Sequence, residues 1–378
     1  MSLTLADILA RHWHDYARIN RPHLCAAHYR AVHRVLACRT PELGGQCYRC
    51  DSCSKHHYAY HSCNHRSCPQ CGSRDQQQWS AKQEAKLLPV PYFMVTFTLP
   101  AELRQACLAH PKELYNTILQ TSAQALRDVT SRRQGYGSQA ATKTHGGITG
   151  FTSVLHTWGR QLQHHPHVHC IVPALAWHPH KKQLIHAKND TFHIHYAPLA
   201  ARFRNLLRQA LQSEHPEIYS QLPPAAKAVF HPNKTWNVQL QHVGRGHTAL
   251  RYLARYVKRS AIGPKRLIGY DKQGNIRLHW TCSQTGKPGI LTLSPRELIR
   301  RWLLHVLPKG FARVRHYGYM SSAACRTLQI IRLHLGIHPH PQPILPEPEP
   351  HRCPCCGSLL TFLREIAPIQ LLRAPPPE

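Results

Sequence analysis

Residues 164–172 have the sequence HHPHVHCIV, which combines alternating histidines with an apolar end and predicts a β-strand. Because side chains alternate between the two faces of a strand, His165, His167 and His169 should share one face. The apolar side chains that alternate with them should share the other. Pro166 has no N–H to donate to a neighbouring strand, so we expect the strand to begin there or to lie at a sheet edge.

The histidine strand is a candidate metal site. His167 and His169 could bind one divalent ion through neutral ring nitrogens and leave coordination positions open. The alternative is a histidine-rich surface strand in a chain that contains 32 histidines. Residues 150–158 predict a neighbouring strand, so His156 would lie within reach of the same ion if the hairpin register permits. The sequence therefore predicts a divalent metal on His167 and His169, with His156 as a possible third ligand.

A second pair of residues could supply a nucleophile. A helix predicted to begin near His247 carries Tyr252 and Tyr256 four residues apart, so both should lie on one face. Core aromatics of an amphipathic helix have the same spacing and are the alternative. Beside a metal that polarises a phosphodiester, a tyrosine could attack phosphorus, which would give a 5′-phosphotyrosine and a free 3′-hydroxyl. The basic residues around the pair are candidate DNA contacts: Arg251, Arg255, Lys258 and Arg259.

Residues 47–71 contain six cysteines and predict structural zinc. Two Cys-x-x-Cys pairs supply four thiolates for a tetrahedral site, and unliganded cysteines are the alternative. A segment this short cannot fold around an apolar core of its own, so the metal should contribute folding energy. Basic neighbours make DNA contact its expected task, although they are also compatible with a solvated surface. We assign zinc to the two cleanest pairs and leave Cys47 and Cys63 spare: Cys50, Cys53, Cys68 and Cys71.

Composition points to a nucleic-acid partner. The 48 Lys and Arg against 18 Asp and Glu give a formal net charge of +30, which attracts polyanions. No apolar run approaches the roughly 20 residues of a membrane-spanning helix, and the N-terminus lacks the pattern of a signal peptide. Fifteen cysteines without an export signal indicate metal binding in a reducing cytosol. We therefore expect a cytoplasmic protein that associates with nucleic acid, which in a bacterium would place it at the nucleoid.

Seven short motifs occur in order along nearly the whole chain: Cys38–Thr40 before Gly44–Gly45, Ser62–Cys71, Phe97–Pro100, Leu155–Gly159, His165–Cys170, Tyr252–Tyr256, and Arg301–Gly310 through Arg315–Gly318. No single motif is specific to one protein family, but the ordered set of seven is. Together they resemble the HUH single-strand endonucleases (His, hydrophobic, His), and more specifically the rolling-circle transposases of IS91-like insertion sequences.

The resemblance implies an α+β HUH fold, with a central antiparallel sheet flanked by helices and an N-terminal zinc ribbon. It implies catalytic Mg²⁺ or Mn²⁺ on His167 and His169, structural Zn²⁺, and nucleophiles at Tyr252 and Tyr256. The expected activity is cleavage and strand transfer of single-stranded DNA at insertion-sequence ends and target. Two alternatives remain: a non-catalytic zinc-dependent DNA-binding protein, such as a decayed transposase, and a rolling-circle replication initiator.

Four segments are expected along the chain. Residues 1–43 form an N-terminal segment of two helices with a break near Asn20, 44–80 a zinc-ribbon DNA-binding domain, and 88–320 the HUH catalytic domain. Within the last of these, Ser294 with Pro295 and Glu297 predicts a helix that begins with a capping box. Residues 321–378 form a helical, proline-rich tail. It contains a cysteine knuckle, a Cys-x-x-Cys pair at 353–356, for which the sequence shows no obvious second pair.

Overall fold

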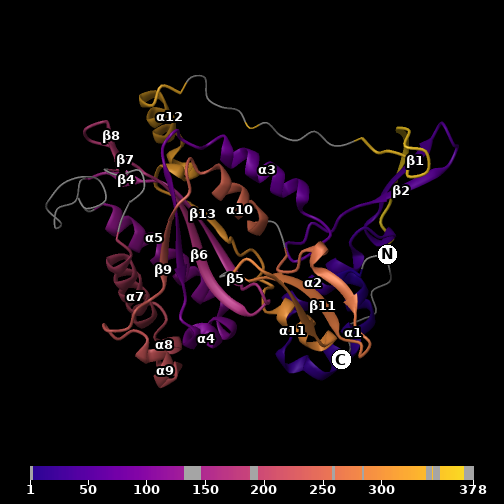
Figure 1. Ribbon diagram of the computed structural model, residues 1–378, viewed down its shortest axis with the longest axis horizontal. Coiled ribbons are helices and arrows are strands. Elements are labelled where there is room, and N and C mark those ends of the chain that lie inside the picture. Colours follow the sequence, from indigo (N-terminus) through magenta and orange to yellow (C-terminus); the bar gives the residue numbers. More distant parts are fainter. Residues whose placement is uncertain are drawn as a thin grey trace.

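The computed structural model describes residues 3–131, 146–187, 195–257, 260–282, 285–337, 343 and 350–369; for residues 255–257 and 264 it describes the backbone alone. Figure 1 shows an α+β body around a central sheet, a smaller group of helices and strands at its lower right, and a projecting β-hairpin at the upper right. Within the described ranges, none of the helices has the length and apolar character needed to cross a membrane.

The central sheet has five strands, and every neighbouring pair is antiparallel. The histidine strand is its middle strand, as the order β13-β5-β6-β3-β9 shows. The predicted α+β class with a central antiparallel sheet flanked by helices is confirmed. The strands are β3 (Tyr92–Thr98), β5 (Phe151–Trp158), β6 (His164–Pro173), β9 (Val238–His242) and β13 (Val314–Tyr317).

Alternation along β6 gives the sheet one apolar face. Val168, Cys170 and Val172 are fully buried in the largest core cluster, whereas His167 and His169 lie on the opposite face. The helices that cover the apolar face carry their own apolar stripes into the same cluster (Figure 1). These helices are α4 (Arg104–Ala109), α5 (Pro111–Thr130), α7 (Tyr196–Ser213), α8 (Pro216–Gln221) and α9 (Pro224–Ala228).

Part of the histidine face is covered and part is open. Leu250 and Leu253 of α10 pack with Val154 and Ile171 of the sheet in a separate core cluster, which also includes residues of α12. The covering elements are α3 (Ser73–Glu84), α10 (His247–Val257) and α12 (Cys325–His334), together with the small sheet of β4 (Ile148–Thr149), β7 (Leu175–His178) and β8 (Gln183–His186).

A further core cluster joins the N-terminal helices to a region near residue 300. The N-terminal helices, predicted as a segment of their own, share this cluster with residues 261–303, which the sequence assigned to the catalytic domain. The predicted break between these helices near Asn20 is confirmed. The elements that contribute are α1 (Leu5–Asn20), α2 (Ala26–Ala37), β10 (Leu267–Tyr270), β11 (Ile276–Thr281), β12 (Pro288–Leu293) and α11 (Pro295–Leu303).

The projecting sheet brings distant segments together. Strands β1 (Gly45–Cys50) and β2 (His56–Tyr60) form a hairpin, and the C-terminal strand β14 (Leu360–Ile366) pairs antiparallel with β1. In Figure 1 the yellow C-terminal segment lies against this hairpin. The predicted N-terminal ribbon therefore includes a strand from the far end of the chain.

The two alternatives predicted for Pro166 have different outcomes. β6 does not begin at Pro166 but earlier, at His164. At Pro166, however, β6 is paired with β5 alone, because its ladder with β3 ends at the pair Thr98–His167. The Pro166 carbonyl accepts from the N–H of Leu99, just beyond β3, so the backbone of Pro166 faces this open side. Proline is tolerated there, as at a sheet edge, because no neighbouring strand needs the N–H that it lacks.

Candidate active site and metal centres

Three histidines from two adjacent strands converge on the open face of the sheet. His156 of β5 lies directly opposite His167 of β6, and His169 follows on the same face. One ring nitrogen from each of the three lies within 4.8 Å of the others. The ring centroids are 5.0 Å apart for His156 and His167, 4.5 Å for His156 and His169, and 4.9 Å for His167 and His169. This spacing suits ligands of one ion.

Hydrogen bonds orient the two strand histidines. The Nδ1 of His167 donates to the carbonyl of His165 at 2.6 Å, and the Nδ1 of His169 lies 2.9 Å from the Thr96 hydroxyl on β3. In each ring the other nitrogen, Nε2, is left available. The Nε2 of His169 is buried and has no hydrogen-bond partner among the described residues. Metal-bound imidazoles are typically held in this way through their second nitrogen.

Burial keeps the three rings neutral. It lowers the pKa of His167 to about 4, and together with the nearby ring of His167 it lowers the pKa of His169 to about 3. Burial also holds the pKa of His156 well below its usual range. A neutral imidazole offers a lone pair to a metal, whereas a protonated one does not. The cluster is therefore ready to bind a cation at neutral pH.

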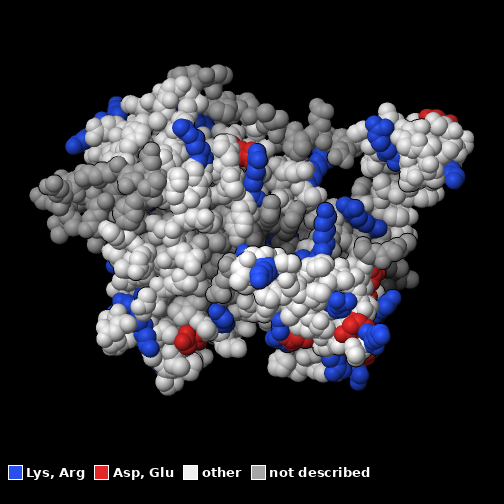
Figure 2. Space-filling view, in the orientation of Figure 1, with Lys and Arg blue, Asp and Glu red and all other residues white. Residues whose placement is uncertain are grey.

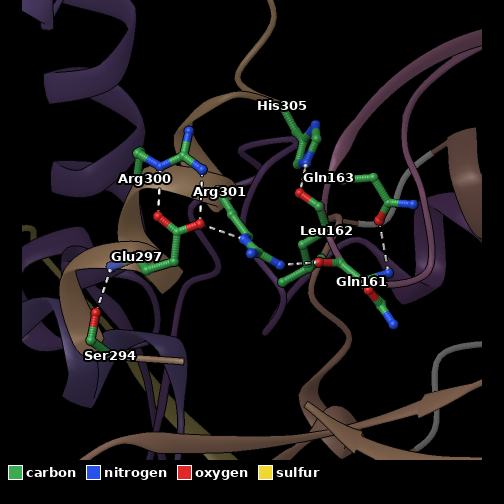
Figure 3. Close-up of polar contacts among 8 residues, drawn as sticks. All are labelled: Gln161, Leu162, Gln163, Ser294, Glu297, Arg300, Arg301 and His305. Carbon is green, nitrogen blue, oxygen red and sulfur yellow. Dashed lines mark hydrogen bonds and ion pairs between the residues drawn. The ribbon is translucent and has the colours of Figure 1, made fainter. Parts of the chain in front are cut away.

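The turn between β5 and β6 is anchored to α11 (Figure 3). Arg301 donates to the carbonyl of Gln161 at 2.9 Å, and Glu297 fixes Arg301 through a 2.6 Å contact to its Nε. His305 donates from Nε2 to the carbonyl of Leu162 at 3.1 Å. Because this turn precedes the histidine strand directly, α11 helps to determine where β6 begins.

The start of α11 confirms the predicted N-cap but only half of the predicted capping box. The Ser294 hydroxyl accepts from the Glu297 N–H at 3.3 Å, as the predicted cap requires. The side chain of Glu297 contacts Arg300 and Arg301 instead of returning to Ser294 (Figure 3). The expected reciprocal capping box is therefore only half formed, because two cations compete for its carboxylate.

Tyr252 lies beside the histidine cluster. Its ring centroid is 6.0 Å from that of His169, with the two planes nearly perpendicular at 87°. The side chain is 36% exposed and lines the same cleft as the three histidines. Tyr256 follows one helical turn later in α10, and its side chain lies outside the described residues.

The predicted DNA contacts around the tyrosines are described only in part. Arg251 is largely exposed, and its Nε lies 3.5 Å from a carboxylate oxygen of Glu84 on α3, so part of its charge is neutralised within the protein. The side chain of Arg255 and the whole of Lys258 and Arg259 lie outside the described residues.

A cleft of about 2140 Å³ opens over the histidines. Among the described residues, its lining contains no Asp or Glu but includes Arg160, Lys265 and Arg266. Aromatic side chains, among them Trp158 and Trp280, also line it. Figure 2 shows more Lys and Arg than Asp and Glu on this face, some of them around the hollow near its centre. A cleft of this composition suits an anionic ligand with flat rings.

The predicted zinc set is divided between two clusters. Cys68 and Cys71 cluster with Cys38 and Cys63, and their ligand atoms all lie within 4.8 Å of one another. Cys50 and Cys53 belong to another cluster on the projecting sheet. One ion needs four sulfurs at about 2.3 Å each, so the assignment of Cys50, Cys53, Cys68 and Cys71 to a single ion is wrong.

The cluster of Cys38, Cys63, Cys68 and Cys71 is buried in the core that the N-terminal helices share with α11. The Cys63 and Cys71 sulfurs are 3.6 Å apart, and the His65 N–H donates to the Cys63 sulfur at 3.5 Å. Such N–H···S contacts are suited to thiolates. Four thiols of this kind fit a closed structural zinc site.

Sequence reasoning missed two kinds of site residue. The sequence assignment leaves Cys63 spare, and Cys38 lies far from the Cys-x-x-Cys pairs in the sequence, although it begins the first of the ordered motifs. Thr96 carries no distinctive signal, because its contact with His169 depends on the pairing of β3 with β6. Arg104, which donates to the His165 ring at 2.9 Å, likewise carries no distinctive sequence signal.

Comparisons with known proteins give a consistent result. Residues 150–327 match a family described as a putative transposase, and residues 8–99 match a transposase zinc-binding domain. The chain is 33% identical over 344 residues to the putative transposase y4qJ of Sinorhizobium fredii, covering 86% of this chain and 83% of the relative. It is 27% identical over 363 residues to the transposase for insertion sequence element IS801 of Pseudomonas savastanoi pv. phaseolicola, covering 89% and 83%.

Among solved structures, the conjugative relaxase TrwC in its metal-free complex with oriT DNA is 18% identical, with a TM-score of 0.27, over 46% of this chain and 67% of that chain. The metal-bound complex of the same relaxase is 20% identical, with a TM-score of 0.26, over 44% and 70%. TM-scores of this size establish no shared activity.

Proposed function

Because the chain belongs to the IS91-like transposase family, we propose that it cuts and rejoins single-stranded DNA at the ends of an insertion sequence through a tyrosine of α10. The observation that carries this proposal is the approach of Tyr252 to the histidine cluster, with 6.0 Å between its ring and that of His169. A nucleophile beside a candidate metal site is an arrangement that suits phosphodiester cleavage.

The residues present fit a divalent ion. His169 offers a buried Nε2 without a protein partner among the described residues, and the ring of His167 is held by its other nitrogen. His156 would be the third ligand. When bound, the ion would polarise the scissile phosphate. All three ligands are imidazoles, which favours Mn²⁺ over Mg²⁺, because Mg²⁺ prefers oxygen ligands.

The protein side of the reaction is a substitution at phosphorus. The hydroxyl oxygen of Tyr252 or Tyr256 forms a bond to phosphorus, and the bond from phosphorus to the 3′-oxygen breaks. The tyrosine proton leaves, and the departing 3′-oxygen ends as a hydroxyl. Attack by a 3′-hydroxyl of another strand then reverses the step and restores the tyrosine. Two tyrosines on one helix allow two such transfers without release of the DNA.

The composition of the cleft supports a single strand as the substrate. Unpaired bases stack on aromatic side chains, while the phosphates are held by cations. Trp158 and Trp280 could serve the first purpose, and Arg160, Lys265 and Arg266 the second.

The zinc-binding domain contains structural Zn²⁺, and we assign one ion to Cys38, Cys63, Cys68 and Cys71. This ion would hold the loop before α3 in the core that α1 and α2 share with α11. The second half of the predicted ribbon would then be fixed to the catalytic region, because Cys63, Cys68 and Cys71 share this core with residues 261–303.

The test is formation of a covalent adduct on labelled single-stranded DNA from an element end. With a 3′-label, the labelled strand should remain attached to the protein in SDS. With a 5′-label, the released fragment should be free and end in a 3′-hydroxyl. The reverse pattern of labels would contradict a 5′-phosphotyrosine.

Tyrosine variants identify the nucleophile. Tyr252→Phe and Tyr256→Phe should each lose some or all of the adduct, and the double variant should form none, because only the attacking oxygen is removed. Tyr196→Phe, another exposed tyrosine of the cleft, is the matched control and should keep the wild-type yield. An adduct from the double variant would place the nucleophile elsewhere. DNA binding by the wild-type protein without any adduct would support the non-catalytic alternative.

A further inference from the structure

A second group of four cysteines joins the two ends of the chain. Cys50 and Cys53 lie at the turn of the β1–β2 hairpin, and Cys353 and Cys356 lie just before β14. The four sulfurs lie within 4.8 Å of one another. The tail knuckle, Cys353 and Cys356, has no obvious second pair in the sequence, but in the folded chain Cys50 and Cys53 complete the group of four. It lies outside both regions that match known transposase families, residues 8–99 and 150–327.

The two knuckles have the same backbone geometry. The Cys50 N–H donates to the carbonyl of Lys55 at 2.9 Å, and the Cys353 N–H donates to the carbonyl of Ser358 at 2.8 Å, five residues on in each case. The residue after each second cysteine has a positive φ, +58° at Ser54 and +75° at Gly357. A left-handed residue is costly for serine, so its presence indicates that the tight turn itself is required.

The distances between sulfurs distinguish metal binding from a disulfide. The Cys50 and Cys356 sulfurs are 3.4 Å apart, and those of Cys53 and Cys353 are 3.6 Å apart. Two sulfurs on a tetrahedral zinc with bonds of about 2.3 Å are roughly 3.8 Å apart. A disulfide needs about 2.05 Å. The spacing and the all-thiol donor set therefore fit zinc.

The projecting sheet needs such a cross-link. Its side chains form little apolar core: Phe362 and Leu363 of β14 are 49% and 41% exposed, and Tyr58 of β2 is 57% exposed. Apart from Tyr48, which is buried against the rings of His351 and Phe362, the side chains add exposed polar links such as Asp51 to Thr361 at 2.6 Å. A small three-stranded sheet without a core is not stable in water without a further constraint.

We propose that Cys50, Cys53, Cys353 and Cys356 bind a second zinc ion, which closes a ribbon made from the two ends of the chain. The N-terminal hairpin and the C-terminal knuckle each supply two thiolates, and pairing of β14 with β1 completes the unit. The ribbon therefore folds only when the C-terminal segment is present.

One competing ligand set is available. The His57 ring lies 3.2 Å from the Cys353 sulfur, and these two group with Cys355. Cys355 is exposed, and its sulfur accepts from the Lys55 ammonium at 3.7 Å. This set has three members against the four of the proposed site, so it would leave the closed tetrahedral geometry incomplete. Cys355 therefore provides a matched control within the same knuckle.

The first test counts zinc in the full-length protein by native mass spectrometry. Wild-type protein should carry two ions, Cys356→Ser one, and Cys355→Ser two. Cys68→Ser should also carry one, because it removes the buried site only. A wild-type count of one, two ions retained by Cys356→Ser, or loss of an ion by Cys355→Ser would overturn the proposal.

The second test needs no substitution and so does not depend on the folding of a variant. Native protein is treated with a thiol-alkylating reagent, with and without a zinc chelator, and the modified cysteines are mapped by mass spectrometry. Cys355 should react at once, whereas Cys50, Cys53, Cys353 and Cys356 should react together, and only after chelation. Equal rates for Cys355 and Cys356 before chelation would contradict zinc at this site.

Discussion

At the scale of single residues, the candidate active site depends on which nitrogen each histidine presents. His167 and His169 both use Nδ1 for a hydrogen bond, so Nε2 is the nitrogen that faces the cluster. The partner of His169 is the hydroxyl of Thr96, on a different strand. The orientation of the His169 ring therefore depends on how the strands pair as well as on the histidine itself.

We predict that His169→Ala abolishes formation of the covalent adduct but changes binding of single-stranded DNA by no more than a few-fold. In the proposed mechanism this variant would lose a ligand of the catalytic ion and keep the basic surface, which would supply most of the affinity. Adduct yield and binding are measured on the same oligonucleotide. Loss of both together would mean that His169 serves the fold or the DNA contact instead.

Thr96→Val tests the orienting contact by itself. Removing the hydroxyl leaves the ligands in place but frees the His169 ring, so the apparent affinity for Mn²⁺ should fall by about 10- to 100-fold. The measurement is adduct yield against Mn²⁺ concentration. Thr98→Val, on the same strand and the same cleft, is the control and should leave the titration unchanged. If saturating Mn²⁺ did not restore the adduct yield of Thr96→Val, the result would contradict a role of Thr96 in positioning the His169 ring alone.

At the scale of elements, the β5–β6 hairpin is held at its turn by α11. His305, which follows this helix, lies between the Thr157 hydroxyl at 3.2 Å and the carbonyl of Leu162 at 3.1 Å. Each contact spans more than 100 residues of sequence. The hairpin that carries the histidines thus depends on a helix whose own start is specified locally by Ser294.

His305 should make the folded protein sensitive to acid. Burial lowers the pKa of this ring from 6.5 to about 4. The unfolded chain therefore takes up the proton at a higher pH than the folded chain. The stabilising contribution is complete above about pH 6.5 and is lost as the pH falls toward 4. We expect a loss of about 2 kcal/mol between pH 7.5 and pH 5 from this residue.

The measurement is the free energy of unfolding by urea at a series of pH values. His305→Gln keeps a polar side chain that cannot be protonated, so its stability should fall less over the same range. Other buried histidines will add their own acid sensitivity to both proteins. Only the difference between the two curves tests this residue, and parallel curves would contradict the prediction.

At the scale of the whole molecule, charge and architecture point to the same partner. The chain has a formal net charge of +30, and the described lining of its main cleft contains no acidic residue. The cleft is bordered by the sheet, by residues next to α3 and by the sheet of β10–β12. Parts of the chain that are distant in sequence therefore combine to form one basic surface.

Affinity for single-stranded DNA should fall steeply with salt. Each phosphate neutralised contributes about −0.7 to the slope of log affinity against log salt, because a condensed counterion is released. We expect a slope of about −3 or steeper, measured by fluorescence anisotropy. His169→Ala should give the same slope as the wild-type protein, because it removes no cation. A slope near zero would rule out phosphate contacts as the source of affinity.

The sequence by itself determined the features that depend on local spacing. Alternation along residues 164–172 placed His167 and His169 on one face, and the four-residue interval put Tyr252 and Tyr256 on successive turns of one helix. Ser294 correctly marked the start of α11. The ordered motifs also identified the family. These features follow from backbone periodicity and capping, which neighbouring residues decide.

Only the tertiary structure decided which distant residues meet. Cys68 and Cys71 cluster with Cys38, while Cys50 and Cys53 cluster with a knuckle 300 residues further on. Thr96 reaches His169 only because β3 pairs with β6, and Pro166 is accepted in β6 because the ladder with β3 ends at His167. The physical reason is common to all of these. A Cys-x-x-Cys pair supplies two of the four ligands of a zinc ion, and a strand edge supplies one side of a hydrogen-bonded ladder. Which residues supply the other side depends on how the whole chain packs.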